Sequence, residues 1–180
     1  MSGLSVFGQV WRNDPFHSKV TFVVTHLMVN DIHGVFDSLK VELQSSRPDF
    51  SDAKIRLSIL TRSINTGVER RDNHLRSEDF FNAGQFPEIS FNSTGIKVIG
   101  KNRYKVSGSL TIHGVTKPIV ADMLYRGSVI NPHSKKNTAG IQVTASLKRS
   151  DFGVGPKFPF DEIRDDVRIR ADGEFVQDAR

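Results

Sequence analysis

A strict alternation of polar and apolar residues runs through Lys54-Ile55-Arg56-Leu57-Ser58-Ile59. Successive side chains of an extended chain point to opposite faces, so this stretch predicts a strand with Ile55, Leu57 and Ile59 on one side. The same two-residue period returns in further short segments: residues 18–24, 39–43, 89–91, 104–106, 110–112, 143–147 and 167–169. Many short strands joined by turn residues are typical of an antiparallel barrel or sandwich, so the sequence predicts an all-β fold.

The composition is that of a globular domain. The chain has 180 residues, of which 37% are hydrophobic and 25% charged, so we expect a single domain over residues 1–180. The absence of cysteine excludes disulfides, thiolate metal ligands and a cysteine nucleophile. No apolar run approaches the roughly 18 residues of a membrane helix. The first ten residues lack a signal-peptide pattern, so the sequence as written predicts a cytoplasmic protein, or a periplasmic one whose leader has been removed.

Glycine and proline mark the expected strand ends. Gly95, Gly100, Gly114 and Gly127 are predicted to lie in turns between strands. Proline has no backbone N–H to donate to a sheet, so neither Pro118 nor Pro132 is expected inside a central strand.

One segment, residues 69–85, departs from the alternation and predicts one or two short helices. Ser77 is a predicted N-cap, with Glu78 and Asp79 in the first turn that follows it, and Gly84 is a predicted helix end. Leu75, Phe80 and Phe81 are expected to turn inward, so that this insertion covers one end of a barrel.

Several ordered motifs resemble the YceI family of bacterial lipid-binding proteins. They are residues 71–81 (RDNHLRSEDFF), 86–93 (FPEISFNS), 108–118 (GSLTIHGVTKP) and 149–153 (RSDFG), together with Trp11, Asp14, His17, Ser18, Phe22, His26 and residues 34–36 near the start. The resemblance covers nearly the whole chain. It implies an eight-stranded antiparallel barrel of lipocalin-like architecture that holds a long amphiphile, such as a polyisoprenoid or fatty-acyl lipid, as a carrier or sequestering protein. It implies no enzymatic activity and no cofactor, and relatives often form homodimers.

The aromatic residues suit such an interior, because the chain has 13 Phe against 1 Trp and 2 Tyr. Apolar side chains offer a hydrocarbon tail contact area without unmet hydrogen bonds, although a plain Phe-rich packed core gives the same pattern. Phe158 and Phe160 lie in a proline-stiffened loop, where they are candidates for a lid or for anchors. The predicted apolar lining is Val20, Phe22, Val24, Phe36, Ile55, Leu57, Ile59, Phe80, Phe81, Phe86, Phe91, Ile112, Val143 and Phe158.

The densest polar cluster lies in residues 71–76. Arg71 and His74 are candidates for a rim that meets an anionic head group, because an Arg fork binds phosphate or carboxylate bidentately. An alternative is that Arg71, Asp72 and Arg76 form a network that fixes the insertion against the barrel.

Two other classes of function are weaker alternatives. Six histidines suggest a metal-dependent enzyme, but His17, His26, His33, His74 and His113 show no metal-ligand spacing, so no metal site is assigned. Residues 91–180 carry 15 Lys/Arg and 9 Asp/Glu, a net +6, against −1 for residues 1–90. A basic half could bind nucleic acid, but the aromatics are expected inside rather than among exposed cations, so no nucleic-acid partner is assigned.

Overall fold

The computed structural model describes residues 8–178, which form mostly antiparallel β-structure. One α-helix, α1 (Glu69–Arg76), and two 3₁₀ helices (Thr61–Ser63 and Arg149–Phe152) accompany the strands. The strands are β1 (Gln9–His26), β2 (Asn30–Phe36), β3 (Leu39–Ser45), β4 (Lys54–Leu60), β5 (Ile64–Asn65), β6 (Glu88–Gly100), β7 (Arg103–Ile112), β8 (Val115–Ile130), β9 (Asn137–Lys148) and β10 (Ile163–Gln177).

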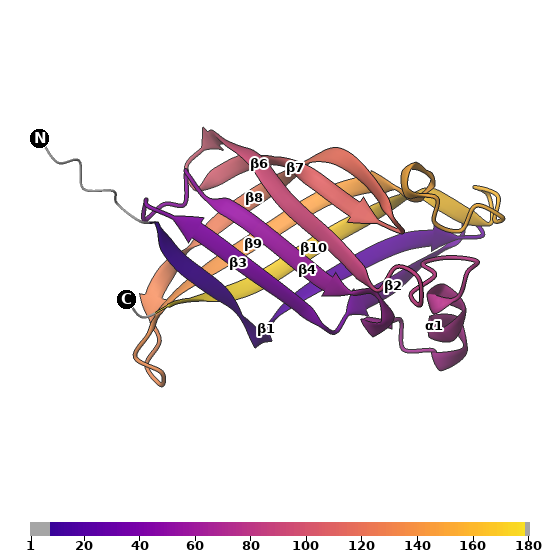
Figure 1. Ribbon diagram of the computed structural model, residues 1–180, viewed down its shortest axis with the longest axis horizontal. Helices are drawn as coiled ribbons and strands as arrows, with labels where there is room; N and C mark the ends of the chain where they lie inside the picture. The colour runs from indigo at the N-terminus through magenta and orange to yellow at the C-terminus, as the bar shows by residue number, and fades with distance from the viewer. Residues whose placement is uncertain (1–7, 179–180) are drawn as a thin grey trace, which may run out of the picture.

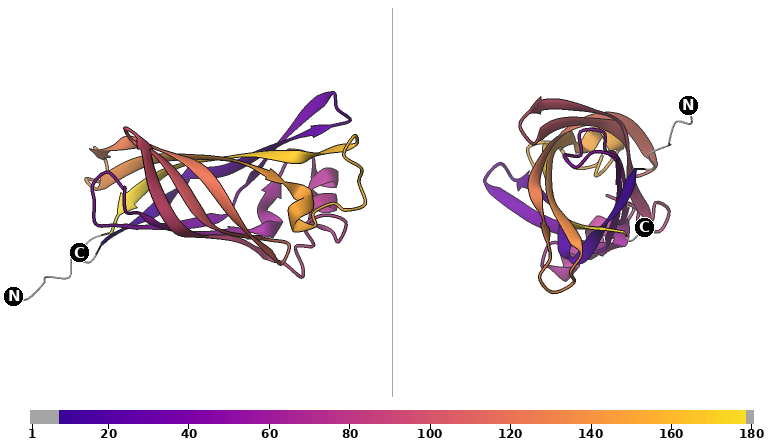
Figure 2. Two further views of the ribbon diagram at one scale, coloured as in Figure 1. Left: turned by 90° about the horizontal axis from the view of Figure 1, so that it is seen from above. Right: turned by 90° about the vertical axis from the view of Figure 1, so that its left-hand side faces the viewer.

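Eight of these strands close into a barrel (Figures 1 and 2). The ring runs β1-β3-β4-β6-β7-β8-β9-β10 and closes where β10 pairs with β1. The short strands β2 and β5 lie outside the ring, β2 on the second half of β1 and β5 on β2. The predicted all-β, eight-stranded antiparallel barrel is therefore confirmed.

The long strand β1 is interrupted in the middle. It pairs with β10 on both sides of a bulge, in which residues 14–17 face Glu174 alone. The first part of β1 pairs with β3, whereas the second part, from Val20 to His26, pairs with β2. Pro15 lies in the bulge, where its missing N–H interrupts no ladder.

The insertion forms one short helix within residues 69–85, as predicted, but the predicted N-cap at Ser77 and helix end at Gly84 are wrong. α1 begins at Glu69 and ends at Arg76, so Ser77 is its C-cap and the following residues form turns. The Ser77 hydroxyl and the Ser77 backbone N–H both donate to the carbonyl of His74, at 2.7 Å and 3.1 Å, and so satisfy an acceptor at the helix end. Figure 1 shows α1 at one end of the barrel, as expected.

The glycine predictions are half confirmed. Gly114 (φ 73°) forms the β7–β8 turn with His113, and Gly100 closes the β6 side of the next hairpin. Gly95 and Gly127 instead lie at bulges inside β6 and β8, where the ladder register shifts.

Neither Pro118 nor Pro132 lies between two paired strands, in agreement with the prediction. Pro118 is inside β8 and opposite Ser109 of β7, but β9 pairs with β8 only from Asp122 onward, so Pro118 has a neighbouring strand on one side. Pro132 lies in the turn after β8.

The barrel end opposite α1 is filled by side chains. The loop at residues 46–53 folds inward and buries Phe50 completely (φ 60°). Its ring centroid lies 5.2 Å from that of Trp11 and 5.1 Å from that of Tyr125. Below it, the buried Tyr104 hydroxyl donates to the carbonyl oxygen of Asp49 at 2.5 Å. We call this the closed end.

Candidate ligand-binding cavity

An apolar cavity of about 440 Å³ lies inside the barrel, between the closed end and α1. Inward side chains from all eight strands of the ring line it. Several of them, including Leu57, Val143 and Ile169, are only partly buried because they face this space rather than another side chain. The volume lies within the range of about 300–1,000 Å³ that is usual for small-molecule sites. The interior is therefore a lined cavity above a packed base.

Thirteen of the fourteen predicted lining residues lie on this cavity. Phe86 does not: its ring packs edge-on against His113, with centroids 4.7 Å apart, and close to Gly114. Phe86 precedes Pro87, where the chain enters β6, so its side chain supports the β7–β8 turn from outside. The thirteen are Val20, Phe22, Val24, Phe36, Ile55, Leu57, Ile59, Phe80, Phe81, Phe91, Ile112, Val143 and Phe158.

Most of the polar groups on the lining gather at the α1 end of the cavity, which we call the mouth. Both predicted rim residues, Arg71 and His74, are among them. Arg71 donates from Nε to the Thr66 hydroxyl at 2.7 Å and from Nη2 to the Thr66 carbonyl at 3.0 Å. The buried Asp72 in turn accepts from the Thr66 N–H at 2.8 Å. Arg71 and Asp72 are therefore linked through Thr66, whereas Arg76 donates to the carbonyls of Arg62 and Ile64 instead. The contacts at Thr66 hold Arg71 at the cavity.

A second polar stretch of the lining lies partway along the wall, beside the β1 bulge. It consists of Ser18, Lys19, Asp172 and Gly173. The lining is thus apolar in the middle of the cavity and polar at the mouth and at this bulge, a distribution that suits an amphiphile.

Two segments meet over the mouth. Phe80, from the turn after α1, stacks on Phe158 of the loop at residues 153–162, with centroids 4.7 Å apart and planes at 15°. Lys157 and His74 both reach Asp79, at 2.7 Å and 3.1 Å. The hydrogen bonds from Lys157 and His74 lower the pKa of the Asp79 carboxyl. Phe158 thus lies at the mouth, where it lines the cavity and stacks on Phe80.

Phe160, the other predicted lid residue, turns outward. Its side chain is 54% exposed and does not line the cavity. The loop that carries it is held by the buried Arg149, whose guanidinium donates to backbone carbonyls of Val154, Gly155, Phe158 and Ile163. Burial lowers the pKa of Arg149.

Sequence reasoning missed Arg149 and Phe50 as structural determinants of the cavity. The sequence around Arg149 gives only a motif, and no local pattern indicates that its partners are carbonyls of the loop that follows it. The available signal for Phe50 was a single aromatic residue in an otherwise polar loop.

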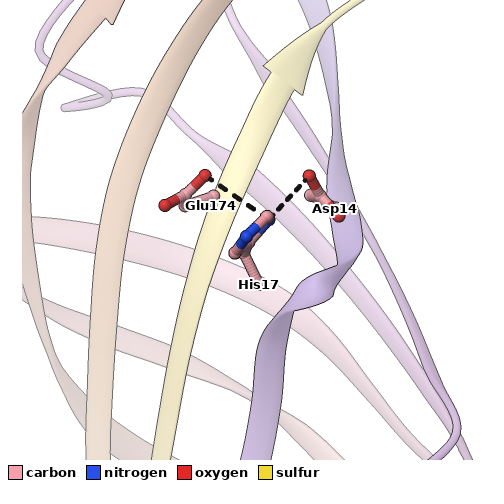
Figure 3. A group of neighbouring side chains, drawn as sticks. All are labelled: Asp14, His17 and Glu174. Atoms are coloured by element: carbon pink, nitrogen blue, oxygen red, sulfur yellow. Dashed lines mark hydrogen bonds and ion pairs between the residues drawn. The ribbon is translucent and has the colours of Figure 1, made fainter. Parts of the chain in front are cut away.

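The histidines do not converge on a metal centre. Within residues 8–178, one group of three potential ligands lies close together, namely Asp14, His17 and Glu174 (Figure 3), and it contains a single histidine. The Nδ1 atom of His17 lies 3.0 Å from Asp14 Oδ2 and 3.9 Å from Glu174 Oε2. The hydrogen bond with Asp14 raises the pKa of His17 and that with His17 lowers the pKa of Asp14. Glu174 alternates with the inward Phe175, so this group faces the outside of the barrel.

Fold and cavity together define the class of protein: a closed eight-stranded antiparallel barrel with an internal apolar site, of lipocalin-like architecture. None of the helices in the described part of the chain is long and apolar enough to cross a membrane.

Comparison with known proteins narrows this class. Residues 11–175 match the YceI-like domain family, and the chain belongs to that family. It is 35% identical over 166 residues to the UPF0312 protein SA2479 of Staphylococcus aureus, covering 90% of this chain and 94% of that protein.

Solved structures share the fold. The YceI protein of Campylobacter jejuni has a TM-score of 0.78 and 28% identity, covering 87% of this chain and 90% of that one. A polyisoprenoid binding domain from Saccharophagus degradans has a TM-score of 0.71 and 16% identity, covering 94% and 98%.

Proposed function

We propose that the protein binds a long-chain amphiphile, such as a polyisoprenoid, a quinone-like lipid or a fatty-acyl lipid, inside the barrel and acts as its carrier or sequestering protein. The observation that carries this proposal is the cavity of about 440 Å³, whose inward aliphatic side chains remain partly exposed. A polyisoprenoid binding domain with the same fold, described above, is consistent with it.

The chemistry of the lining favours an amphiphile over a polar substrate. Each methylene moved from water to an apolar site contributes about 0.8 kcal/mol, so a tail of ten or more carbons can offset the cost of association. Arg71 and His74 lie at the mouth and can donate to a head group, whereas Leu43 and Phe175 line the deep end. This order predicts a head group at the mouth and a tail directed toward the closed end.

Organic extraction of the purified protein followed by mass spectrometry tests the proposal directly. We expect the extract to contain a lipid with a long hydrocarbon chain. An extract without lipid, combined with failure of the protein to bind added polyprenols, quinones and fatty acids, would refute the proposal.

A pair of variants on one strand tests the site. Val143 lines the cavity, whereas the next residue, Thr144, points to the outer face of β9. We expect Val143→Trp to reduce the affinity for a fluorescent fatty acid at least about tenfold, because the indole occupies the space of the tail. Thr144→Trp is the matched control and should bind as the wild type does. Circular dichroism and thermal unfolding of both variants establish that each is folded.

A further inference from the structure

The hairpin between β1 and β2 ends in three exposed apolar residues. Leu27, Met28 and Val29 are 54%, 47% and 84% exposed. The N–H of Val29 donates to the carbonyl of His26 at 3.1 Å, which closes a tight turn around Leu27 (φ 50°) and Met28 (φ 58°). We call residues 27–29 the apolar tip.

This turn uses residues that its backbone disfavours. Two consecutive positive φ angles in a hairpin turn are best adopted by Asn-Gly, because Cβ approaches the following carbonyl oxygen in this region. Glycine has no Cβ, and the short side chain of asparagine can form a local hydrogen bond. Leucine and methionine at these positions cost conformational energy, and their exposure adds an unfavourable contact with water. Within the described residues, the polar contact that Met28 makes is a long one, 3.7 Å from its sulfur to Arg164. The choice of side chains thus favours a partner outside the barrel.

The apolar tip adjoins the mouth of the cavity. The N–H of Leu27 donates to the carbonyl of Glu162 at 2.7 Å, and both Glu162 and the preceding His26 line the cavity. Phe160, also exposed, lies two residues before Glu162 in the same loop. Figure 2 shows this hairpin projecting past the barrel wall at the end that carries α1 and the loop at residues 153–162. A surface that receives the tip therefore lies directly against the mouth.

The size and charge of this region indicate which partner it fits. The three exposed side chains of the tip, together with Phe160, supply far less than the about 800 Å² per partner of a stable protein interface. The neighbouring charges are of both signs and partly paired, as in the contact between Arg168 and Asp31. A small, protruding and uncharged apolar group matches the interfacial layer of a lipid bilayer, into which such side chains insert.

Resting on the proposed function, we propose that the apolar tip, with Phe160, inserts into a lipid bilayer surface and so places the mouth against the membrane that supplies or receives the amphiphile. Insertion is driven by apolar burial, so zwitterionic lipid suffices and salt has little effect. The barrel then exchanges its ligand without passing the hydrocarbon tail through water.

Flotation with vesicles of pure phosphatidylcholine tests the docking. The variant Leu27→Asn/Met28→Gly/Val29→Thr removes the apolar tip and installs the favoured turn residues, so the fold should be retained or stabilised. We expect this variant to lose at least about tenfold in vesicle binding, because each large aliphatic side chain removed from hydrocarbon changes the partition constant by about that factor. The matched control is Val129→Thr/Ile130→Thr. It removes two aliphatic side chains at the closed end whose exposure (65% and 64%) lies within the range of the tip residues, and it should bind as the wild type does.

Three results would overturn the proposal. They are wild-type protein that fails to float with phosphatidylcholine, a tip variant that floats as well as the wild type, or binding that requires anionic phosphatidylglycerol and is lost at moderate salt. The last result would indicate docking through the closed-end hairpins, since residues 97–105 and 126–136 contain seven Lys/Arg and no acidic residue.

A second measurement separates this proposal from the proposed function. The residues of the tip do not line the cavity, so the tip variant should bind a fluorescent fatty acid in vesicle-free solution with unchanged affinity. Transfer of that probe from phosphatidylcholine vesicles to the variant should slow at least about tenfold, in line with the lost vesicle binding. A wild type that floats, but yields no lipid on extraction and binds none of the added polyprenols, quinones and fatty acids, would refute the lipid-binding function and leave the docking intact.

Discussion

At the scale of single residues, the missing side chain of Gly34 shapes the cavity wall. Gly34 pairs with Phe22, and a Cβ atom built on Gly34 would lie 2.2 Å from Cζ of the Phe22 ring. The far edge of the ring therefore lies over Gly34, and the glycine makes room for it. Alternation placed Phe22 inside correctly, but the role of Gly34 depends on the register between two strands, which neither segment shows alone.

We expect Gly34→Ala to destabilise the barrel by about 1–3 kcal/mol, because the new methyl group forces the Phe22 ring out of its position. Urea unfolding measures this change in the free energy of unfolding. Gly95→Ala is the control, since nothing lies within 4 Å of a Cβ atom there and its φ is not positive. Equal effects at the two positions would show that loss of glycine, rather than contact with Phe22, is responsible.

At the scale of elements, the loop that forms the closed end depends on one carboxylate. Burial alone would raise the pKa of Asp52, but hydrogen bonds from the hydroxyls of Ser45 and Ser46 and from the N–H groups of Ser46 and Arg47 lower it to about 2. These bonds tie the two ends of the loop together beneath Phe50.

The pH dependence of stability follows from that shift. The pKa of Asp52 is lower in the folded than in the unfolded state, so its contribution is present above about pH 4 and is lost as pH falls toward about 2. We expect Asp52→Asn to lower the free energy of unfolding at pH 7 by about 1–2 kcal/mol, after allowance for solvent screening. Urea unfolding between pH 7 and pH 2 should show the difference shrinking. A difference that is constant with pH would mean that ionisation of Asp52 does not stabilise the loop.

A second element, the lid over the mouth, is expected to control rates. Phe158→Ala removes the stacking partner of Phe80 and opens the path to the cavity, so the probe fatty acid should associate and dissociate several-fold faster. Stopped-flow fluorescence measures both rates. Phe160→Ala, in the same loop but outside the lining, should leave the rates in solution unchanged. Unchanged rates in Phe158→Ala would place the path of exchange elsewhere, with the polar wall at the β1 bulge as the next candidate.

The existence of elements could be predicted better than their ends. Period-two patterns identify seven of the eight ring strands, and the polar segment identifies the helix. No predicted segment falls in β8, and the two at residues 104–106 and 110–112 both lie in β7. The predicted N-cap at Ser77 is wrong because Ser followed by two acidic residues is only a general N-terminal signal. In the structure Ser77 is the C-cap of α1, and Leu75, Phe80 and Phe81 on either side of it pack in or against the core. The sequence predicts turns at Gly95 and Gly127, where the structure has bulges, because a bulge and a turn use glycine for the same conformational reason.

At the scale of the whole molecule, the sequence predicts which side chains face inward but not whether they meet. The distance between opposite walls depends on the number of strands and their stagger, and these arise only when β10 closes on β1. The same aliphatic alternation therefore describes both the filled end around Tyr104 and the open region around Leu57. The two regions differ because the loop at residues 46–53 places Phe50 inside one end only.

This difference between the two ends of the barrel predicts the direction in which a ligand lies. Trp11 is the chain's single tryptophan, and it is buried at the closed end opposite Leu43, which lines the deep part of the cavity. Fatty acids brominated near the methyl end should quench Trp11 fluorescence more strongly than those brominated near the carboxylate, because heavy-atom quenching needs close approach. In urea-unfolded protein the two probes should quench equally. Stronger quenching by the carboxylate-proximal bromines would reverse the orientation, with the head group at the closed end, and would exclude a head-group role for Arg71 and His74.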